Sequence, residues 1–173
     1  MTEPRLKVLY ADDEDDVREV FAAVFAPDFD VQTAPSGADA LATLAAGEFD
    51  VLVSDMRMEP MKGSELLARA FETHPDVQRI LLTGYSDHDD LADAVNLGHV
   101  FAYMQKPWDG EQLKLTIDKA GKQRRLELEN RRLVAELRAA NAELHADVEV
   151  ATRTAPPKPK LMVTSPSMAK GLD

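Results

Sequence analysis

The first 121 residues alternate short apolar runs with amphipathic helical patterns, and this alternation restricts the chain to few folds. The runs are rich in β-branched and aromatic residues, as strands are. They predict strands over residues 6–10, 29–33, 49–53, 77–82 and 100–104. Strands that alternate with helices form βαβ units, which build a parallel sheet covered by helices on both faces. The sequence therefore predicts an α/β domain with a doubly wound five-stranded parallel sheet, whose binding site lies at the carboxyl ends of the strands.

The segments between these runs carry helix signals of their own. Five apolar residues between Val17 and Phe25 recur at the spacing of one helix face. Ser36 has a side chain suited to capping the start of a second helix, and Gly47 is suited to its end. A third helix is expected after Gly63. These helices would connect consecutive strands of the sheet.

The last helical pattern begins near Asp109 and meets no stop signal until about Val150. With a rise of about 1.5 Å per residue, this helix would be about 60 Å long, far beyond what a domain of this size can cover. Its second half, residues 122–150, carries a heptad repeat with an apolar seam. The a and d positions of that repeat predict a parallel dimeric coiled coil, with a single solvated helix as the alternative; they are Leu126, Asn130, Leu133, Leu137, Ala140 and Leu144.

Charge divides the chain into the same parts. Residues 1–121 carry a net charge of −14, residues 122–150 are neutral, and residues 151–173 carry +3. Four prolines in the last segment forbid a helix there, so we expect a flexible tail or linker. The predicted organisation is a folded domain over 1–121, a coiled coil over 122–150 and a tail over 151–173.

Composition excludes several classes of protein. The 173 residues include no Cys, which leaves no disulfide framework and no thiolate metal site. The N-terminal segment is acidic and no apolar stretch reaches membrane-spanning length, so we expect a cytoplasmic protein without a membrane segment. The net charge of −11 and a pI near 4.8 argue against direct nucleic-acid binding, which depends on Lys and Arg.

Three carboxylates fall at the ends of neighbouring predicted strands. Asp12 and Asp13 follow the first strand, and Asp55 follows the third. Carboxylates that converge at one edge of a sheet repel one another unless a cation lies among them. Mg²⁺ suits such a site, since it binds oxygen ligands and commonly takes one or two carboxylates together with phosphate oxygens.

Two further residues belong to the same edge. Thr83 ends the fourth predicted strand and offers a hydroxyl, while Lys106 follows the fifth and offers a cation. Together with the three carboxylates they are typical of a phosphoryl-transfer site. A metal ion would neutralise the developing charge, Thr83 and Lys106 would bind the outer oxygens, and one Asp would attack.

The motifs around these residues are similar to those of a known family. They are Val8 to Glu14, Val53 to Met58 with Met61 and Gly63, Leu81 to Gly84, and Tyr103 to Trp108. Because the motifs occur in this order, the sequence resembles a response-regulator receiver domain of two-component signalling, a family whose fold is flavodoxin-like. The family usually has Pro four residues after the aspartate that corresponds to Asp55. This chain has Glu59 at that position, and Pro60 follows.

The resemblance implies that Asp55 is the phosphoacceptor and that the cofactor is Mg²⁺. It further implies that Asp13 binds the metal directly, that Asp12 binds it through water, and that the Arg57 carbonyl and Asp55 complete the ligand set. A sensor histidine kinase or a phosphotransfer protein would be the phosphoryl donor.

The resemblance also implies the parts of a switch. Thr83 and Lys106 would hold the phosphoryl group, Tyr103 would be the aromatic switch, and Lys106–Pro107 would be a cis bond. The signal would pass through the last helix to a parallel homodimer formed by residues 122–150, and from there to a downstream output domain or partner. Such a protein catalyses its own phosphorylation and dephosphorylation and is not otherwise an enzyme. The alternatives are an Mg²⁺-dependent phosphohydrolase that forms an aspartyl-phosphate and a degenerate receiver that serves only for dimerisation.

Overall fold

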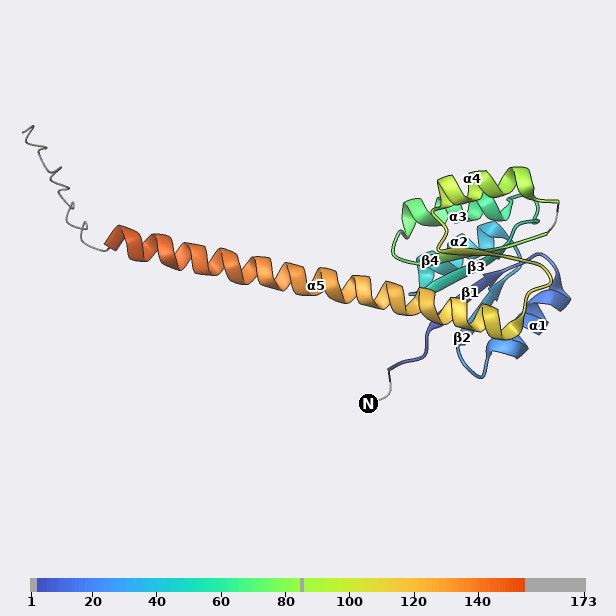
Figure 1. Cartoon of the computed structure of the whole chain (residues 1–173), viewed down its shortest axis with the longest axis horizontal. Helices are drawn as coiled ribbons and strands as arrows, with labels where there is room; N and C mark the ends of the chain where they lie inside the picture. The colour runs from blue at the N-terminus through green and yellow to red at the C-terminus, as the bar shows by residue number, and fades with distance from the viewer. Residues whose placement is uncertain (1–2, 85, 155–173) are drawn as a thin grey trace, which may run out of the picture. The chain divides into compact units, whose positions relative to one another are not determined.

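The computed structural model describes residues 3–84 and 86–154, so the predicted tail falls almost wholly outside the described residues. Strands and helices alternate along the chain (Figure 1). In order they are β1 (Lys7–Ala11), α1 (Asp15–Phe25), β2 (Asp30–Ala34), α2 (Gly37–Ala46), β3 (Val51–Asp55), α3 (Gly63–Thr73), β4 (Gln78–Thr83), α4 (His88–Gly98), β5 (Ala102–Gln105) and α5 (Gly110–Thr154).

The five strands form one parallel sheet in the order β2-β1-β3-β4-β5. The central pair, β1 and β3, joins Tyr10 to Val53 in register, and β3 pairs with β4 so that Asp55 lies opposite Leu82. Because the strands are parallel, all their carboxyl ends meet at one edge of the sheet. The predicted doubly wound, flavodoxin-like fold is confirmed.

Helices cover the sheet on both faces, as Figure 1 shows: α1 and the first part of α5 lie on one face, and α2, α3 and α4 lie on the other. Side chains of β1 and β3 alternate between the two faces, as strand geometry requires. Tyr10 and Val53 therefore pack with α1 and α5, whereas Leu9 and Leu52 pack with α2 and α3. The core consists of these two buried layers, and it fixes the strand ends in place.

Every strand begins one or two residues later than its apolar pattern predicted. Apolar residues just before four of the five ladders are buried; Leu6, Phe29, Phe49 and Val77 are 5–6% exposed. They close the bottom of the core without belonging to the ladder. At the other end the ladder runs through polar residues, so that β3 ends at Asp55. The apolar pattern thus indicates which residues are buried, whereas the hydrogen bonds between strands determine where each strand begins and ends.

Side chains cap two of the helix starts, and Ser36 is the cap that the sequence predicted. The Ser36 side chain accepts from the Asp39 amide at 3.1 Å, and Asp109 accepts from the amides of Glu111 and Gln112. Helix α5 ends at Thr154, four residues beyond the predicted end, because the sequence contains no breaker before Pro156. No helix among the described residues is both long and apolar enough to cross a membrane.

The division between the two compact units of the chain falls inside α5, after Arg132. The first unit holds the sheet, its helices and α5 up to that residue. Along the predicted seam, Leu126, Leu133, Leu137 and Leu144 are 50–67% exposed. The structure is that of a single chain, so the coiled coil stays a prediction.

Candidate functional site

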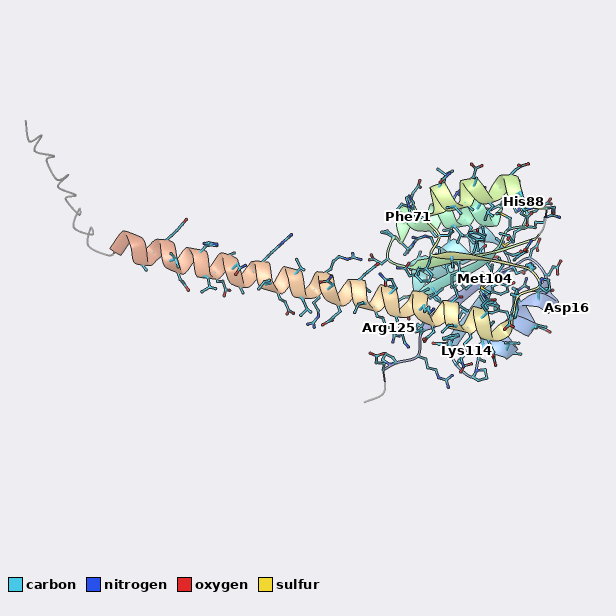
Figure 2. The ribbon with its side chains drawn as sticks, in the orientation of Figure 1. Asp16, Phe71, His88, Met104, Lys114 and Arg125 are labelled. Atoms are coloured by element: carbon cyan, nitrogen blue, oxygen red, sulfur yellow. The ribbon has the colours of Figure 1, made fainter. Side chains whose placement is uncertain are left out.

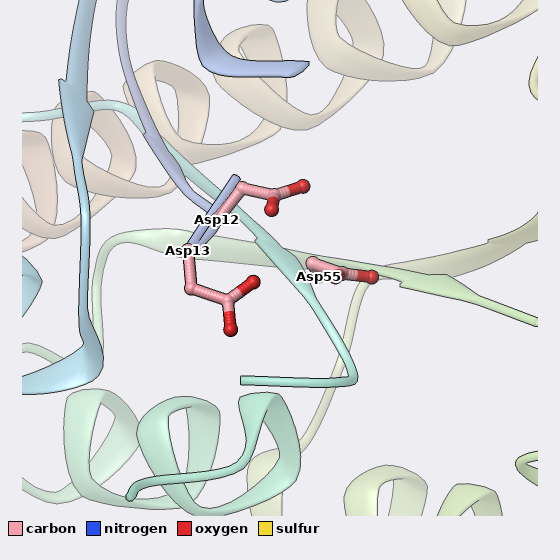
Figure 3. Close-up of side chains that lie close together, drawn as sticks. All are labelled: Asp12, Asp13 and Asp55. Atoms are coloured by element: carbon pink, nitrogen blue, oxygen red, sulfur yellow. The ribbon is translucent and has the colours of Figure 1, made fainter. Parts of the chain in front are cut away.

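The three predicted carboxylates converge at the carboxyl edge of the sheet (Figure 3). Asp12 and Asp13 follow β1, and Asp55 ends the neighbouring strand β3. Each residue offers one carboxylate oxygen, and these oxygens all lie within 4.8 Å of one another. Carboxylate oxygens at this separation could share one divalent cation, and a hard ion such as Mg²⁺ prefers such oxygen ligands.

Asp55 lies in a pocket of low solvent access with one cation beside it. Its exposed fraction is only 7%, and Lys106 Nζ lies 2.7 Å from its Oδ1 atom. Burial raises the pKa of the Asp55 carboxyl above its usual range, and Asp12 adds to that rise, whereas Lys106 acts against it. One lysine therefore does not balance the charge of the three carboxylates.

Asp12 is held in place by two donors. Its exposed fraction is 1%; the Tyr10 hydroxyl donates to Oδ2 at 2.6 Å, and the Glu14 amide donates to Oδ1 at 3.0 Å. Burial and the Asp12 carboxylate both raise the pKa of Tyr10, which keeps its hydroxyl protonated as a donor. Tyr10 was not among the site residues predicted from the sequence. Its spacing of two from Asp12 carried the signal, since residues two apart on a strand share a face.

Asp13 is exposed and lines a cavity of about 920 Å³. Arg57, Lys62 and Asp87 also line this cavity. Met56, the residue after Asp55, also lines the cavity, which therefore opens next to the carboxylate cluster.

The Arg57 side chain links two loops beside the site. Its Nε atom lies 2.9 Å from Asp87 Oδ1, and its guanidinium also bonds Ser86. Asp87 is 5% exposed and accepts from the Gly84 amide at 2.7 Å through its second oxygen. Although burial opposes it, the Arg57 contact and the Gly84 amide lower the pKa of Asp87. Asp87 lies 30 residues from its partner, so no sequence spacing indicated this contact.

Thr83 and Lys106 lie together where β4 and β5 end. The Lys106 amide donates to the Thr83 carbonyl at 2.8 Å, which continues the ladder past the end of β5. Within the described part of the chain, the contact of the Thr83 hydroxyl is a long one of 3.5 Å with the Met104 carbonyl. Tyr103 is 55% exposed and borders a hollow of about 210 Å³ that Thr83 and Leu91 also line.

Two backbone features shape the rim of the site. A Cβ atom at Gly63 would overlap the Asp55 carbonyl oxygen, so only glycine allows the start of α3 to approach β3 this closely. The Lys106–Pro107 bond is cis, as predicted, and the Glu59–Pro60 bond is cis as well.

Comparison with known proteins agrees with this geometry. The sequence profile described as "Response regulator receiver domain" matches residues 8–118, which include every predicted site residue of the sheet edge. The chain belongs to the response regulator receiver family. This receiver is similar to the hydrogenase transcriptional regulatory protein HoxA of Cupriavidus necator, with 31% identity over 144 residues, 83% of this chain and 30% of HoxA. The receiver chain thus spans about a third of the length of the curated relatives it matches.

Two further likenesses concern a second regulator and a solved structure. The C4-dicarboxylate transport transcriptional regulatory protein DctD of Rhizobium meliloti is 31% identical over 138 residues, 79% of this receiver and 30% of DctD. The signal receiver domain of an HD domain-containing protein from Pseudomonas fluorescens superposes with a TM-score of 0.71 and 31% identity. That match covers 75% of this chain and 96% of the other.

Proposed function

We propose that this receiver accepts a phosphoryl group on Asp55 from a sensor histidine kinase or a phosphotransfer protein, with Mg²⁺ at the carboxylate cluster. The observation that carries the proposal is the placement of Asp55. It is a buried carboxylate with oxygens of two further carboxylates within 4.8 Å and with Lys106 Nζ 2.7 Å away. This arrangement matches what an aspartyl nucleophile in phosphoryl transfer requires.

The proposed phosphoryl transfer requires no oxidant or reductant. A carboxylate oxygen of Asp55 attacks phosphorus, the phosphorus–nitrogen bond of the donor phosphohistidine breaks, and the imidazole nitrogen keeps the electron pair. Lys106, already 2.7 Å from Asp55, is within reach of the transferred phosphoryl oxygens. Its charge offsets part of the negative charge that builds up in the transition state.

The carboxylate cluster fits a bound Mg²⁺. Asp13 and Asp55 would hold the ion directly, Asp12 would hold it through water, and the Arg57 carbonyl would complete the set. The bound ion supplies positive charge that offsets the repulsion among the carboxylates and the incoming phosphoryl oxygens. The two donors to Asp12 keep that carboxylate in a fixed direction before any ion binds.

Phosphorylation would then change the surface beside β5. It adds about −1.5 to −2 charges and three acceptor oxygens. The Thr83 hydroxyl, which lies 3.5 Å from the Met104 carbonyl, can turn toward those oxygens, and the Tyr103 ring can move into the hollow it borders. We propose that α5 carries the change to a parallel homodimer through residues 122–150 and to an output domain or partner. HoxA and DctD are named as transcriptional regulators, which suits an output of that kind.

Incubation with a small phosphodonor and Mg²⁺, followed by a phosphate-affinity gel, tests the acceptor. We expect one retarded band for the wild type and none for Asp55→Asn. Asp30→Asn is the matched control, because Asp30 is exposed at the opposite edge of the sheet and should be modified like the wild type. Equal modification of Asp55→Asn and the wild type would overturn the assignment.

Two further measurements address the alternatives. A phosphohydrolase would turn over phosphate monoesters continuously; we expect no such turnover, since Arg57 stands two residues after Asp55, where such enzymes usually have an acid/base Asp. A degenerate receiver would not respond to a phosphate-mimicking fluoride complex. We expect that complex with Mg²⁺ to change the shape of the dimer in the wild type but not in Asp55→Asn.

A further inference from the structure

A second buried aspartate, Asp50, lies just before β3, at the edge of the sheet opposite the proposed phosphoacceptor Asp55. Asp50, 5% exposed, directly precedes β3 and accepts from the Lys7 amide at 2.9 Å. Two consecutive arginines of α5 reach it: Arg124 lies 2.9 Å from Oδ1 and Arg125 lies 3.3 Å from Oδ2. Asp50, Arg124 and Arg125 are called the clamp below.

Further contacts hold α5 to the same edge. Arg125, labelled in Figure 2, also donates to the carbonyls of Pro4 and Arg5 at 2.7 and 3.1 Å. One turn and a half further on, Arg131 pairs with Asp76. Two of the three clamp side chains are at least 84% buried, so solvent screens their pairing less than that of surface ion pairs. The helix is therefore tied to its own domain well past residue 118, where the family profile ends.

The burial pattern of α5 gives the direction of this attachment. Ile117, Ala120 and Gly121 are buried, and Arg124, Arg125 and Leu128 are half-buried. In contrast, Leu126 is 67% exposed and Asn130 is exposed. With about 100° per residue, the mean direction of positions 124, 125 and 128 lies about 170° from that of positions 126 and 130. The clamp and the predicted seam thus occupy opposite faces of one helix.

Charges beside the seam favour a parallel partner. In a parallel pair, the g position of one helix faces the following e position of the other, which brings Lys122 opposite Glu127. In an antiparallel pair g faces g, which brings the glutamates at 129, 136 and 143 opposite one another. Asn130 at an a position also finds its own copy only in a parallel, in-register pair. A second copy of this chain therefore fits the exposed face.

We infer that the clamp fixes the rotation of α5 on the receiver, so that Leu126 and Asn130 face a second copy and the two receivers flank the start of a parallel coil on its outer sides. The inference rests on the proposed homodimer and adds the element that sets its geometry. The clamp couples the receiver to the coil because a helix that cannot turn on its own domain transmits a shift of that domain to the seam.

Disulfide trapping tests the face, and the absence of native Cys makes single substitutions clean. We expect Leu126→Cys and Asn130→Cys to form covalent dimers under mild oxidation, since a and d positions approach their own copies in a parallel pair. Ala135→Cys, at the outward f position, is the matched control and should stay monomeric on a non-reducing gel. Cross-linking that is strongest at Ala135→Cys, or absent at both seam positions, would overturn the inference.

Distances between the two receivers test the clamp itself. A spin label on Glu72→Cys, an exposed α3 residue, should give one narrow distance distribution in the dimer. Asp50→Asn should broaden it, as should the double variant Arg124→Gln/Arg125→Gln, which leaves β3 untouched. Glu65→Gln removes a surface ion pair of α3 that does not involve α5 and should leave the distribution narrow.

The outcomes separate the clamp from the proposed function. A dimer with the same narrow distribution in both clamp variants would refute the clamp while the dimer stands. A monomeric wild type in light scattering would refute the dimer and the clamp together, and phosphorylation of Asp55 would be unaffected. Absence of Asp55 phosphorylation in a dimer that broadens as expected would refute only the phosphoryl-transfer proposal.

Discussion

Two buried aspartates bracket strand β3, and their surroundings differ in charge balance. Asp50 lies before the strand with two arginines and a backbone amide, whereas Asp55 ends the strand with one lysine and two neighbouring carboxylates. Both are at most 7% exposed, so burial alone does not separate them. A carboxylate whose charge is fully paired can serve as an anchor, and one that is under-compensated attracts a cation or a phosphoryl group. The opposite edges of one sheet thus suit opposite tasks.

The largest effect on stability should follow from removing the paired aspartate. Asp50→Ala should lower the free energy of unfolding by about 3 kcal/mol, because it leaves two partly buried guanidinium groups without their carboxylate. Urea unfolding followed by circular dichroism measures the change. Asp30→Ala, an exposed position of the same edge, should change stability by less than about 0.5 kcal/mol. Equal stability of the two variants would mean that the clamp contributes nothing to the fold.

Adding Mg²⁺ should stabilise the protein through the carboxylate cluster at the Asp55 edge of the sheet and not through the Asp50 edge. At a free concentration of about 100 Kd, Mg²⁺ should stabilise the wild type by about 2.7 kcal/mol, since it binds only the folded state. Thermal unfolding with and without Mg²⁺ measures this shift. Asp13→Asn should reduce it strongly by removing an exposed ligand of the cluster, while Asp50→Asn should keep it. A shift that survives in Asp13→Asn would assign the ion to another site.

Removing the Tyr10 hydroxyl, which donates to Asp12, should have an intermediate effect on the free energy of unfolding. Tyr10→Phe keeps the ring stacked on Phe21, whose centroid is 3.9 Å away, but removes the 2.6 Å hydrogen bond. One buried carboxylate oxygen then lacks this donor, and the free energy of unfolding should fall by about 1–2 kcal/mol. Denaturant unfolding without Mg²⁺ measures the loss. Unchanged stability would show that water replaces the hydroxyl.

The smallest effect should have the opposite sign. Burial raises the pKa of Asp55 in the folded state, so the ionised carboxylate destabilises the fold above that pKa and the penalty fades as the pH falls through it. Asp55→Asn without Mg²⁺ should therefore raise the free energy of unfolding at neutral pH, by about 1 kcal/mol or less because Lys106 loses its partner. The gain should shrink toward acidic pH. A loss of stability at neutral pH would contradict the charge imbalance.

Local patterns were enough to predict that these polar residues lie at one edge of the sheet, because each of them ends or follows a strand. Asp12, Asp55, Thr83 and Lys106 stand next to apolar runs, and the parallel arrangement of the strands brings those ends together. The strand limits were less predictable, since buried residues such as Phe49 precede the ladder and extend the apolar pattern. Tyr10 was missed because an aromatic residue inside an apolar run resembles ordinary core.

The sequence by itself determined the α/β fold, the acidic cluster and a last helix longer than its domain, because hydrophobic periodicity and residue type are local properties of the chain. Only the tertiary structure decided how distant charges pair. Asp50 meets Arg124 and Arg125 across about 75 residues, and Arg57 meets Asp87 across 30. Such pairs depend on which loop ends the packed sheet brings together, and no spacing along the chain encodes that proximity. The rotation of α5 on the receiver belongs to the same class, because it follows from packing and ion pairs on a face that the heptad pattern does not include.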